Sequence, residues 1–63
     1  MSVDIRFKIA RQVAGLTQLQ LAEAVGVRES LITRIESGRA KPDRATAERI
    51  GQILGKRPLE LGI

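Results

Sequence analysis

Five closely spaced residues carry side chains that suit hydrogen bonding to the edges of nucleic-acid bases. They lie between positions 28 and 34 and are Arg28, Glu29, Ser30, Thr33 and Arg34. Arginine can donate two bonds to guanine O6 and N7, glutamate can accept from the cytosine amino group, and Ser or Thr can bond to several bases. If Ile32 and Ile35 turn toward a core, helical spacing places this set on the opposite face. We interpret the five as candidate base-reading residues, although a merely solvated face would look similar.

A second group has the chemistry to bind phosphate. Thr17 and Gln18 open a predicted helix, whose free backbone N–H groups and dipole favour an anion. Five of the 11 Lys and Arg residues fall between positions 28 and 44, beside the candidate base readers. The residues expected to bind DNA phosphates are therefore Thr17, Gln18, Arg39, Lys41 and Arg44. The alternatives are that Thr17 only caps its helix and that the basic run only solubilises the surface.

The elements that must position these residues are two short helices between Thr17 and Ser37. Thr17 followed by Gln20 is a capping box, so the first of the two helices starts near residue 18. Its apolar face consists of Leu21, Ala22 and Val25. Gly26 can form the tight turn, because glycine adopts a left-handed conformation without a Cβ penalty. A second helix over about 28–36, ending at Gly38, completes a helix-turn-helix, whose second helix enters a groove of DNA.

The N-terminal segment has a mixed pattern. Residues 3 to 9 alternate between apolar and charged, which is typical of a strand. A helical stripe is also present, formed by Val3, Phe7, Ala10 and Ala14 and widened by Ile5, Ile9 and Val13. Because no hairpin partner is near, we predict a helix over 4–14, capped by Asp4 or Ser2 and ended by Gly15.

The C-terminal half predicts one longer helix and one very short one. Residues 39–42 form a loop because Pro42 disfavours helix before it. Asp43 then caps a helix over about 44–54, whose inward residues are Ala47, Ile50, Ile53 and Leu54, and Gly55 closes it. Pro58 suits the first turn of a fifth helix, although the alternation of Leu59, Leu61 and Ile63 leaves an extended tail open. The predicted fold is all-α, a compact bundle of four to five short helices.

Arg11 and Glu36 are each one position from an inward-facing residue, so both should border the core. If their helices cross there, the two residues can form a partly buried ion pair. The competing interpretation places Glu36 on the DNA-facing side, which is less favourable because a carboxylate repels phosphates.

Composition limits the classes of function. The 63 residues, 1–63, fit a single domain, and a net charge of +4 favours an anionic partner. Without Cys or His, and with scattered acids, the chain offers no recognisable catalytic or metal-ligand set. We expect no enzyme activity, metal, cofactor or small-molecule ligand. No apolar run approaches the ~20 residues of a membrane span, and no signal-peptide core opens the chain, so we expect a cytoplasmic protein.

The chain resembles the Cro/cI-type (XRE-like) helix-turn-helix family. The resemblance rests on spaced residues over roughly 3–61: Arg11, Gly15, Leu16, Thr17, Gln18, Leu21, Ala22, Gly26, Val27, Ile32, Ile35, Glu36, Gly38 and Pro42. That family includes phage repressors, Cro proteins, restriction–modification controllers and many antitoxins. It implies a bacterial, archaeal or phage-encoded, lambda repressor-like domain of five helices. The implied function is a transcriptional repressor that binds a palindromic operator as a homodimer, with half-sites roughly 34–36 Å apart.

The resemblance also implies roles for individual residues. Gln18 would hold a phosphate and also reach a base. Arg39 and Arg44 would touch the backbone or a minor groove, and Arg11 with Glu36 would be an interhelical ion pair. The residues that would read the major groove are Arg28, Glu29, Ser30 and Arg34. Two departures from the family pattern are Arg28, where a Ser or Thr cap is common, and Lys56, where an apolar residue is common.

The C-terminus is the candidate dimer contact, through Leu59, Leu61 and Ile63. Closure of the core is an equal alternative for Leu59 and Leu61. A rival function is an antitoxin-type protein-interaction module, in which the same residues and an exposed Leu19 would bind a toxin or other protein. A third is sequence-independent nucleic-acid binding, which would show similar affinity for random and operator duplexes.

Overall fold

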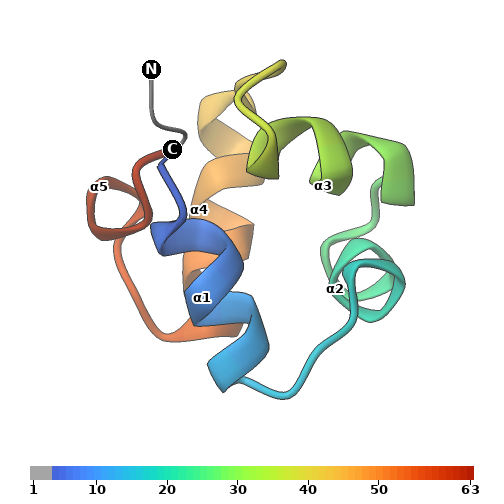
Figure 1. Cartoon of the computed structure of the whole chain (residues 1–63), viewed down its shortest axis with the longest axis horizontal. Coiled ribbons are helices and arrows are strands. Elements are labelled where there is room, and N and C mark those ends of the chain that lie inside the picture. The colour runs from blue at the N-terminus through green and yellow to red at the C-terminus, as the bar shows by residue number, and fades with distance from the viewer. Residues whose placement is uncertain (1–3) are drawn as a thin grey trace.

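The computed structural model describes residues 4–63, and all regular structure within that range is helical (Figure 1). The five helices are α1 (Arg6–Val13), α2 (Gln18–Val25), α3 (Glu29–Glu36), α4 (Arg44–Leu54) and α5 (Pro58–Leu61). The prediction of an all-α fold is therefore confirmed. The fifth segment is a helix rather than an extended tail.

Local capping chemistry sets most helix ends. The Thr17 hydroxyl accepts from the Gln20 backbone N–H at 3.0 Å, and the Gln20 side chain accepts from the Thr17 N–H at 2.9 Å. The Asp43 carboxylate accepts from the Thr46 N–H at 2.8 Å and so caps α4. Gly26 ends α2 with φ +85°, a conformation that a residue with a Cβ rarely adopts. The capping box, the α4 cap and the turn at Gly26 are confirmed.

α1 is shorter than the predicted helix over 4–14. It begins at Arg6, and the residue preceding it, Ile5, makes no side-chain cap. Asp4 contributes instead by accepting from the Arg6 backbone N–H at 3.0 Å. Two residues of the earlier interpretation, Ser2 and Val3, lie outside the described residues.

The core lies where the helices meet, and its buried apolar residues come from every element. They are Phe7, Leu21, Ala22, Val25, Ile32, Ile35, Ile50 and Leu61. The closest packing joins α2 to α3, α2 to α4, α4 to α5 and α1 to α5. Figure 1 shows α5 at the left and α2 and α3 at the right, with α4 behind α1. The helix-turn-helix and the C-terminal helix therefore occupy opposite sides of the molecule.

Three apolar residues of the predicted stripe, on α1 and its N-cap, lie outside the core. Ile5, Ile9 and Val13 are 55%, 48% and 83% exposed. Helical spacing correctly places them together, but no other helix covers that side of α1. Ile9 and Val13 line an open groove of about 460 Å³, whose further lining includes Leu54 and Lys56.

The two C-terminal leucines differ in how deeply they are buried. Leu61 is 1% exposed and closes the core, whereas Leu59 is 83% exposed. Burial removes Leu61 from the candidate dimer contacts, and core closure is wrong for Leu59. Ile63 is half-buried. Within residues 4–63, no helix combines the length and the apolarity that crossing a membrane requires.

Candidate DNA-binding surface

The exposed face of α3 carries the five candidate base-reading residues. Ile32 and Ile35 are buried and hold the helix against the core. The side chains that remain exposed to solvent are Arg28, Glu29, Ser30, Thr33 and Arg34. The structure thus brings together all five on one side of a single short helix. Their polar groups face solvent, apart from the Thr33 hydroxyl proton, which is donated within the protein.

The start of α3 differs from the start of α2. Arg28 occupies the N-cap position with extended backbone, and its side chain makes no capping bond. First-turn N–H groups of a helix have no partners within the helix. At α3 the Leu31 N–H donates to the Arg28 carbonyl at 3.0 Å, and the Glu29 and Ser30 N–H groups are left to solvent or to an incoming anion. Glu29 in the first turn interacts favourably with the helix dipole.

A buried ion pair lies beneath this surface. Arg11 Nε donates to Glu36 Oε2 at 2.6 Å, and Arg11 Nη2 donates to Glu36 Oε1 at 3.3 Å. Arg11 Nη1 also donates to the Leu16 carbonyl at 2.7 Å. The two residues are 7% and 8% exposed, so Glu36 does not belong to the exposed face of α3. Removal of either partner would leave the other charge buried and uncompensated.

The Gln18 side chain connects this ion pair to Thr33 on the exposed face of α3. Its Nε2 donates to Glu36 Oε1 at 3.0 Å, and its Oε1 accepts from the Thr33 hydroxyl at 3.0 Å. Both ends of the side-chain amide are therefore engaged within the protein. Sequence reasoning missed this network. The sequence contained one signal for it: Gln18 is a polar residue at the start of α2, and Glu36 is a carboxylate expected at the edge of the core.

Thr17 has the capping role that sequence reasoning left open, but that role leaves part of its hydroxyl free. The oxygen accepts from the Gln20 N–H. A hydroxyl also has a proton to donate. The exposed Thr17 can therefore cap α2 and still donate to a phosphate.

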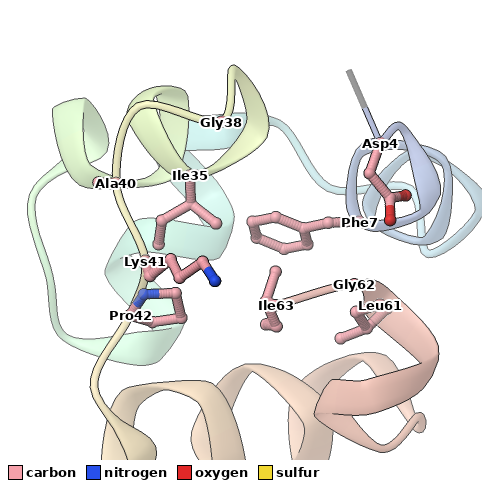
Figure 2. A pocket seen from close by; sticks show the side chains of 10 residues that line it. All are labelled: Asp4, Phe7, Ile35, Gly38, Ala40, Lys41, Pro42, Leu61, Gly62 and Ile63. Carbon is pink, nitrogen blue, oxygen red and sulfur yellow. The ribbon is translucent and has the colours of Figure 1, made fainter. Parts of the chain in front are cut away.

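The basic residues after α3 do not share one environment. Arg39, Lys41 and Arg44 are all exposed. Arg44 pairs with Glu48 at 3.2 Å in an exposed ion pair, which is easily exchanged for another anion. Lys41 lines a pocket of about 90 Å³ between the loop that precedes α4 and the C-terminus, and Figure 2 shows its amine reaching toward Ile63. Its side chain therefore extends toward the C-terminal residues.

Carboxylates with lowered pKa values lie outside the helix-turn-helix. Hydrogen bonds from Arg6 lower the pKa of Asp4 to about 2. Hydrogen bonds from Thr46 lower the pKa of Asp43, and the bond from the Arg57 backbone lowers that of Glu60. These groups stabilise the starts of α1, α4 and α5. They are capping and surface interactions, and all three residues lie outside α2 and α3.

Lys56, which departs from the expected apolar type, contributes through its backbone. Its carbonyl lies so close to Gly51 of α4 that a Cβ at position 51 would clash with it. The Lys56 N–H donates to the Gly51 carbonyl at 3.0 Å. The Lys56 side chain is exposed. The turn into α5 therefore depends on a small residue at Gly51 rather than on an apolar residue at position 56.

Comparisons with known proteins agree with this geometry. A sequence profile described as helix-turn-helix matches residues 7–61. An uncharacterized HTH-type transcriptional regulator of Methanothermobacter thermautotrophicus is 44% identical over 50 residues, which are 79% of this chain and 72% of that protein. The crystal structure of the restriction-modification controller protein C.AhdI from Aeromonas hydrophila superimposes with a TM-score of 0.80 at 27% identity, covering 89% of this chain and 85% of that one. The chain therefore belongs to the helix-turn-helix family of DNA-binding transcription regulators, and to its XRE-like, Cro/cI-type branch.

Proposed function

We propose that the chain is a site-specific transcriptional repressor that places α3 in the major groove of a palindromic operator. The observation that carries the proposal is the division of α3 into two faces. Ile32 and Ile35 anchor one face in the core, and the other exposes a dense set of donors and acceptors. A rigidly held polar face of this kind suits the direct reading of base edges.

Base contacts and phosphate contacts have separate roles. Residues at the start of α3 and Arg34 would read bases, as helix-turn-helix proteins do with the N-terminal part of the recognition helix. Thr17, Arg39, Lys41 and Arg44 would bind phosphates, along with the backbone N–H of Gln18. Each basic phosphate contact that is removed should lower the slope of log affinity against log salt by about 1.

The proposed active form is a homodimer, because a palindrome presents two identical half-sites to two identical chains. Leu59 and Ile63 are the remaining candidates for the contact, since Leu61 is in the core. Occupancy of the operator by such a dimer would exclude competing proteins and so repress transcription.

A selection from random duplexes at near-physiological salt tests the proposal. We expect enrichment of a palindromic motif, and sedimentation of the enriched complex should give two chains per duplex. An enriched site without two-fold symmetry would contradict the dimer. Equal affinity for all duplexes would contradict site-specific binding.

Exposed apolar residues favour one second candidate, an antitoxin-type protein-interaction module. Leu19 is 50% exposed on α2. The apolar residues exposed on the other side are Ile5, Ile9, Val13 and Leu59. Under this alternative the chain would bind a protein partner tightly and DNA only weakly. Failure of the duplex selection, together with stoichiometric co-purification of one partner protein, would favour it.

A further inference from the structure

A line of hydrogen bonds connects the buried ion pair with the exposed face of α3. Arg11 donates to Glu36, and Gln18 Nε2 donates to the same carboxylate at 3.0 Å. Gln18 Oε1 in turn accepts from the Thr33 hydroxyl at 3.0 Å. The line therefore begins in the interior and ends at Thr33, which is exposed among the candidate base readers.

The chemistry of Glu36 determines which way the Gln18 amide points. As a carboxylate paired with Arg11, Glu36 can only accept hydrogen bonds. A glutamine amide has one donating end and one accepting end. The donating Nε2 must therefore face Glu36, and Oε1 is left facing Thr33. A neutral amide in place of Glu36 could donate as well as accept, and it would permit both orientations.

The orientation of Gln18 determines what Thr33 offers to a ligand. A threonine hydroxyl has one proton to donate and two lone pairs that accept. Two acceptors inside the protein compete for that proton, Gln18 Oε1 at 3.0 Å and the Glu29 carbonyl at 3.3 Å. Gln18 Oε1 is the nearer acceptor, so it receives the proton as long as Glu36 holds the amide in this orientation. Only lone pairs of the hydroxyl remain for a partner.

We propose that Glu36 is a positioning residue that acts through Gln18, and that Thr33 consequently reads DNA as a hydrogen-bond acceptor. In the major groove, the donors are the amino groups of adenine and cytosine, whereas guanine and thymine present acceptors at the corresponding edge. Thr33 therefore favours adenine or cytosine on the strand that it contacts, at one position of each half-site. This inference rests on the proposed site-specific DNA binding and adds a preference at one base.

Parallel selections from random duplexes test the inference. The variants are T33V, which keeps the shape but removes the hydroxyl, T33S, which restores it, and E36Q, which lets the Gln18 amide turn. E23Q is the matched control, because it makes the same charge change at an exposed site on α2. All selections are run below the unfolding temperature of each variant, verified by circular dichroism.

The expected result is position-specific. The wild type should enrich adenine or cytosine at one position per half-site. T33V should reduce that preference about 3- to 10-fold and leave the other positions unchanged, which corresponds to the loss of one neutral hydrogen bond. T33S should retain it. E36Q should weaken the preference at the same position although Thr33 is intact, and E23Q should reproduce the wild-type motif.

Several outcomes would overturn the inference. A motif unchanged by T33V contradicts Thr33 as an acceptor. So does an affinity that stays the same when the amino group at the T33V-sensitive position is removed, by purine in place of adenine or 2-pyrimidinone in place of cytosine. A preference unchanged in folded E36Q contradicts the positioning role of Glu36. These results refute the inference alone and leave the proposed function intact. A wild-type chain that enriches no motif refutes both.

A measurement on the free wild-type chain covers the case in which E36Q does not fold. In ¹⁵N-resolved NMR spectra, the Gln18 side-chain amide should give one proton protected from exchange and shifted by its bond to Glu36. The other proton should resemble that of a solvated glutamine. Two equivalent, rapidly exchanging protons would show that the amide is not held, and would overturn the inference.

Discussion

The two sides of this molecule are stabilised in different ways. On the α2–α3 side, Glu36, Gln18 and Thr33 form a connected network with Arg11, which reaches across from α1. Within residues 4–63, no buried side-chain polar atom lacks a hydrogen-bond partner. On the α1–α5 side, packing around Leu61 and a close backbone approach at Gly51 hold the helices, and several large apolar residues stay exposed. The difference indicates where precise orientation of side chains is needed. Orientation is controlled on the side that we propose to face DNA.

Breaking the network should have the largest effect on stability. E36A leaves the Arg11 guanidinium buried without a counter-charge, and we expect a loss on the order of 3–5 kcal/mol in the free energy of unfolding. Urea denaturation of E36A and of the exposed control E23A measures the difference. A midpoint for E36A equal to that of E23A would contradict a stabilising role for the ion pair.

Crowding the opposite side should have a smaller but clear effect. In G51A, the added Cβ would meet the Lys56 carbonyl, so the turn into α5 must move. Overpacking of this kind costs about 1–3 kcal/mol. Thermal unfolding of G51A tests this, and A45G, at an exposed position in the same helix, shows the ordinary difference between Ala and Gly in α4. A rise in the unfolding temperature of G51A as large as the fall in A45G would show that α5 moves without cost.

Removing an exposed side chain from α3 should change the affinity for DNA and leave the free energy of unfolding almost unaltered. Arg34 is exposed on α3, so R34A should cost about 1–3 kcal/mol in binding to the enriched duplex and relax the preference at one base pair. Titration of the enriched duplex and its single-base variants measures both effects. A loss that is uniform across all duplexes would assign Arg34 to phosphate contact instead.

Acid should loosen the α1–α5 side before the α2–α3 side. Asp4, Asp43 and Glu60 have lowered pKa values in the folded chain, so they stabilise it above their ordinary values of 3.8–4.5. That stabilisation is lost as the pH falls from about 4.5 toward the pKa of about 2 at Asp4. Hydrogen exchange across this range should show α1, α4 and α5 opening first.

D43N provides the control for the acid experiment. Asparagine also caps helices well but does not titrate, so D43N should show a shallower loss of stability on acidification. Earlier opening of α2 and α3, or stability that rises toward pH 2, would contradict the assignment.

The smallest effect is expected on the exposed stripe of α1. Val13 is 83% exposed, so V13S should change the free energy of unfolding by less than about 0.5 kcal/mol. The buried Val25 provides the contrast, because V25A opens a cavity and should cost at least about 1 kcal/mol. A larger loss in V13S that grows with protein concentration would reveal a second chain covering this face.

The sequence predicted the helix-turn-helix accurately because its signals are local. Thr17, Gln20, Gly26 and Asp43 determine helix ends through bonds to their own neighbours, and the structure places those ends within two residues of the prediction. The stripe that includes Ile5 and Val13 was predicted, but the exposure of these two residues was not. Periodicity shows which residues share a face, but it does not show whether another helix covers that face.

The sequence predicted which residues lie on the candidate surface, but it did not predict the hydrogen bonds among them. The exposed set on α3 follows from the burial of Ile32 and Ile35. The bonds from Gln18 to Glu36 and Thr33 depend on how closely α2 and α3 approach, which is a property of the tertiary structure. For the same reason, the sequence could not decide between Leu59 and Leu61 as the core residue.

The most direct test of the central claim is a comparison of two affinities. The enriched duplex and a scrambled duplex of the same length and base composition are titrated with the wild-type chain at the same near-physiological salt. The account predicts binding to the enriched site about 10³-fold tighter or more, as is usual for specific recognition. Equal affinities with equal salt dependence would contradict it, because the exposed face of α3 would then contribute nothing to the choice of sequence.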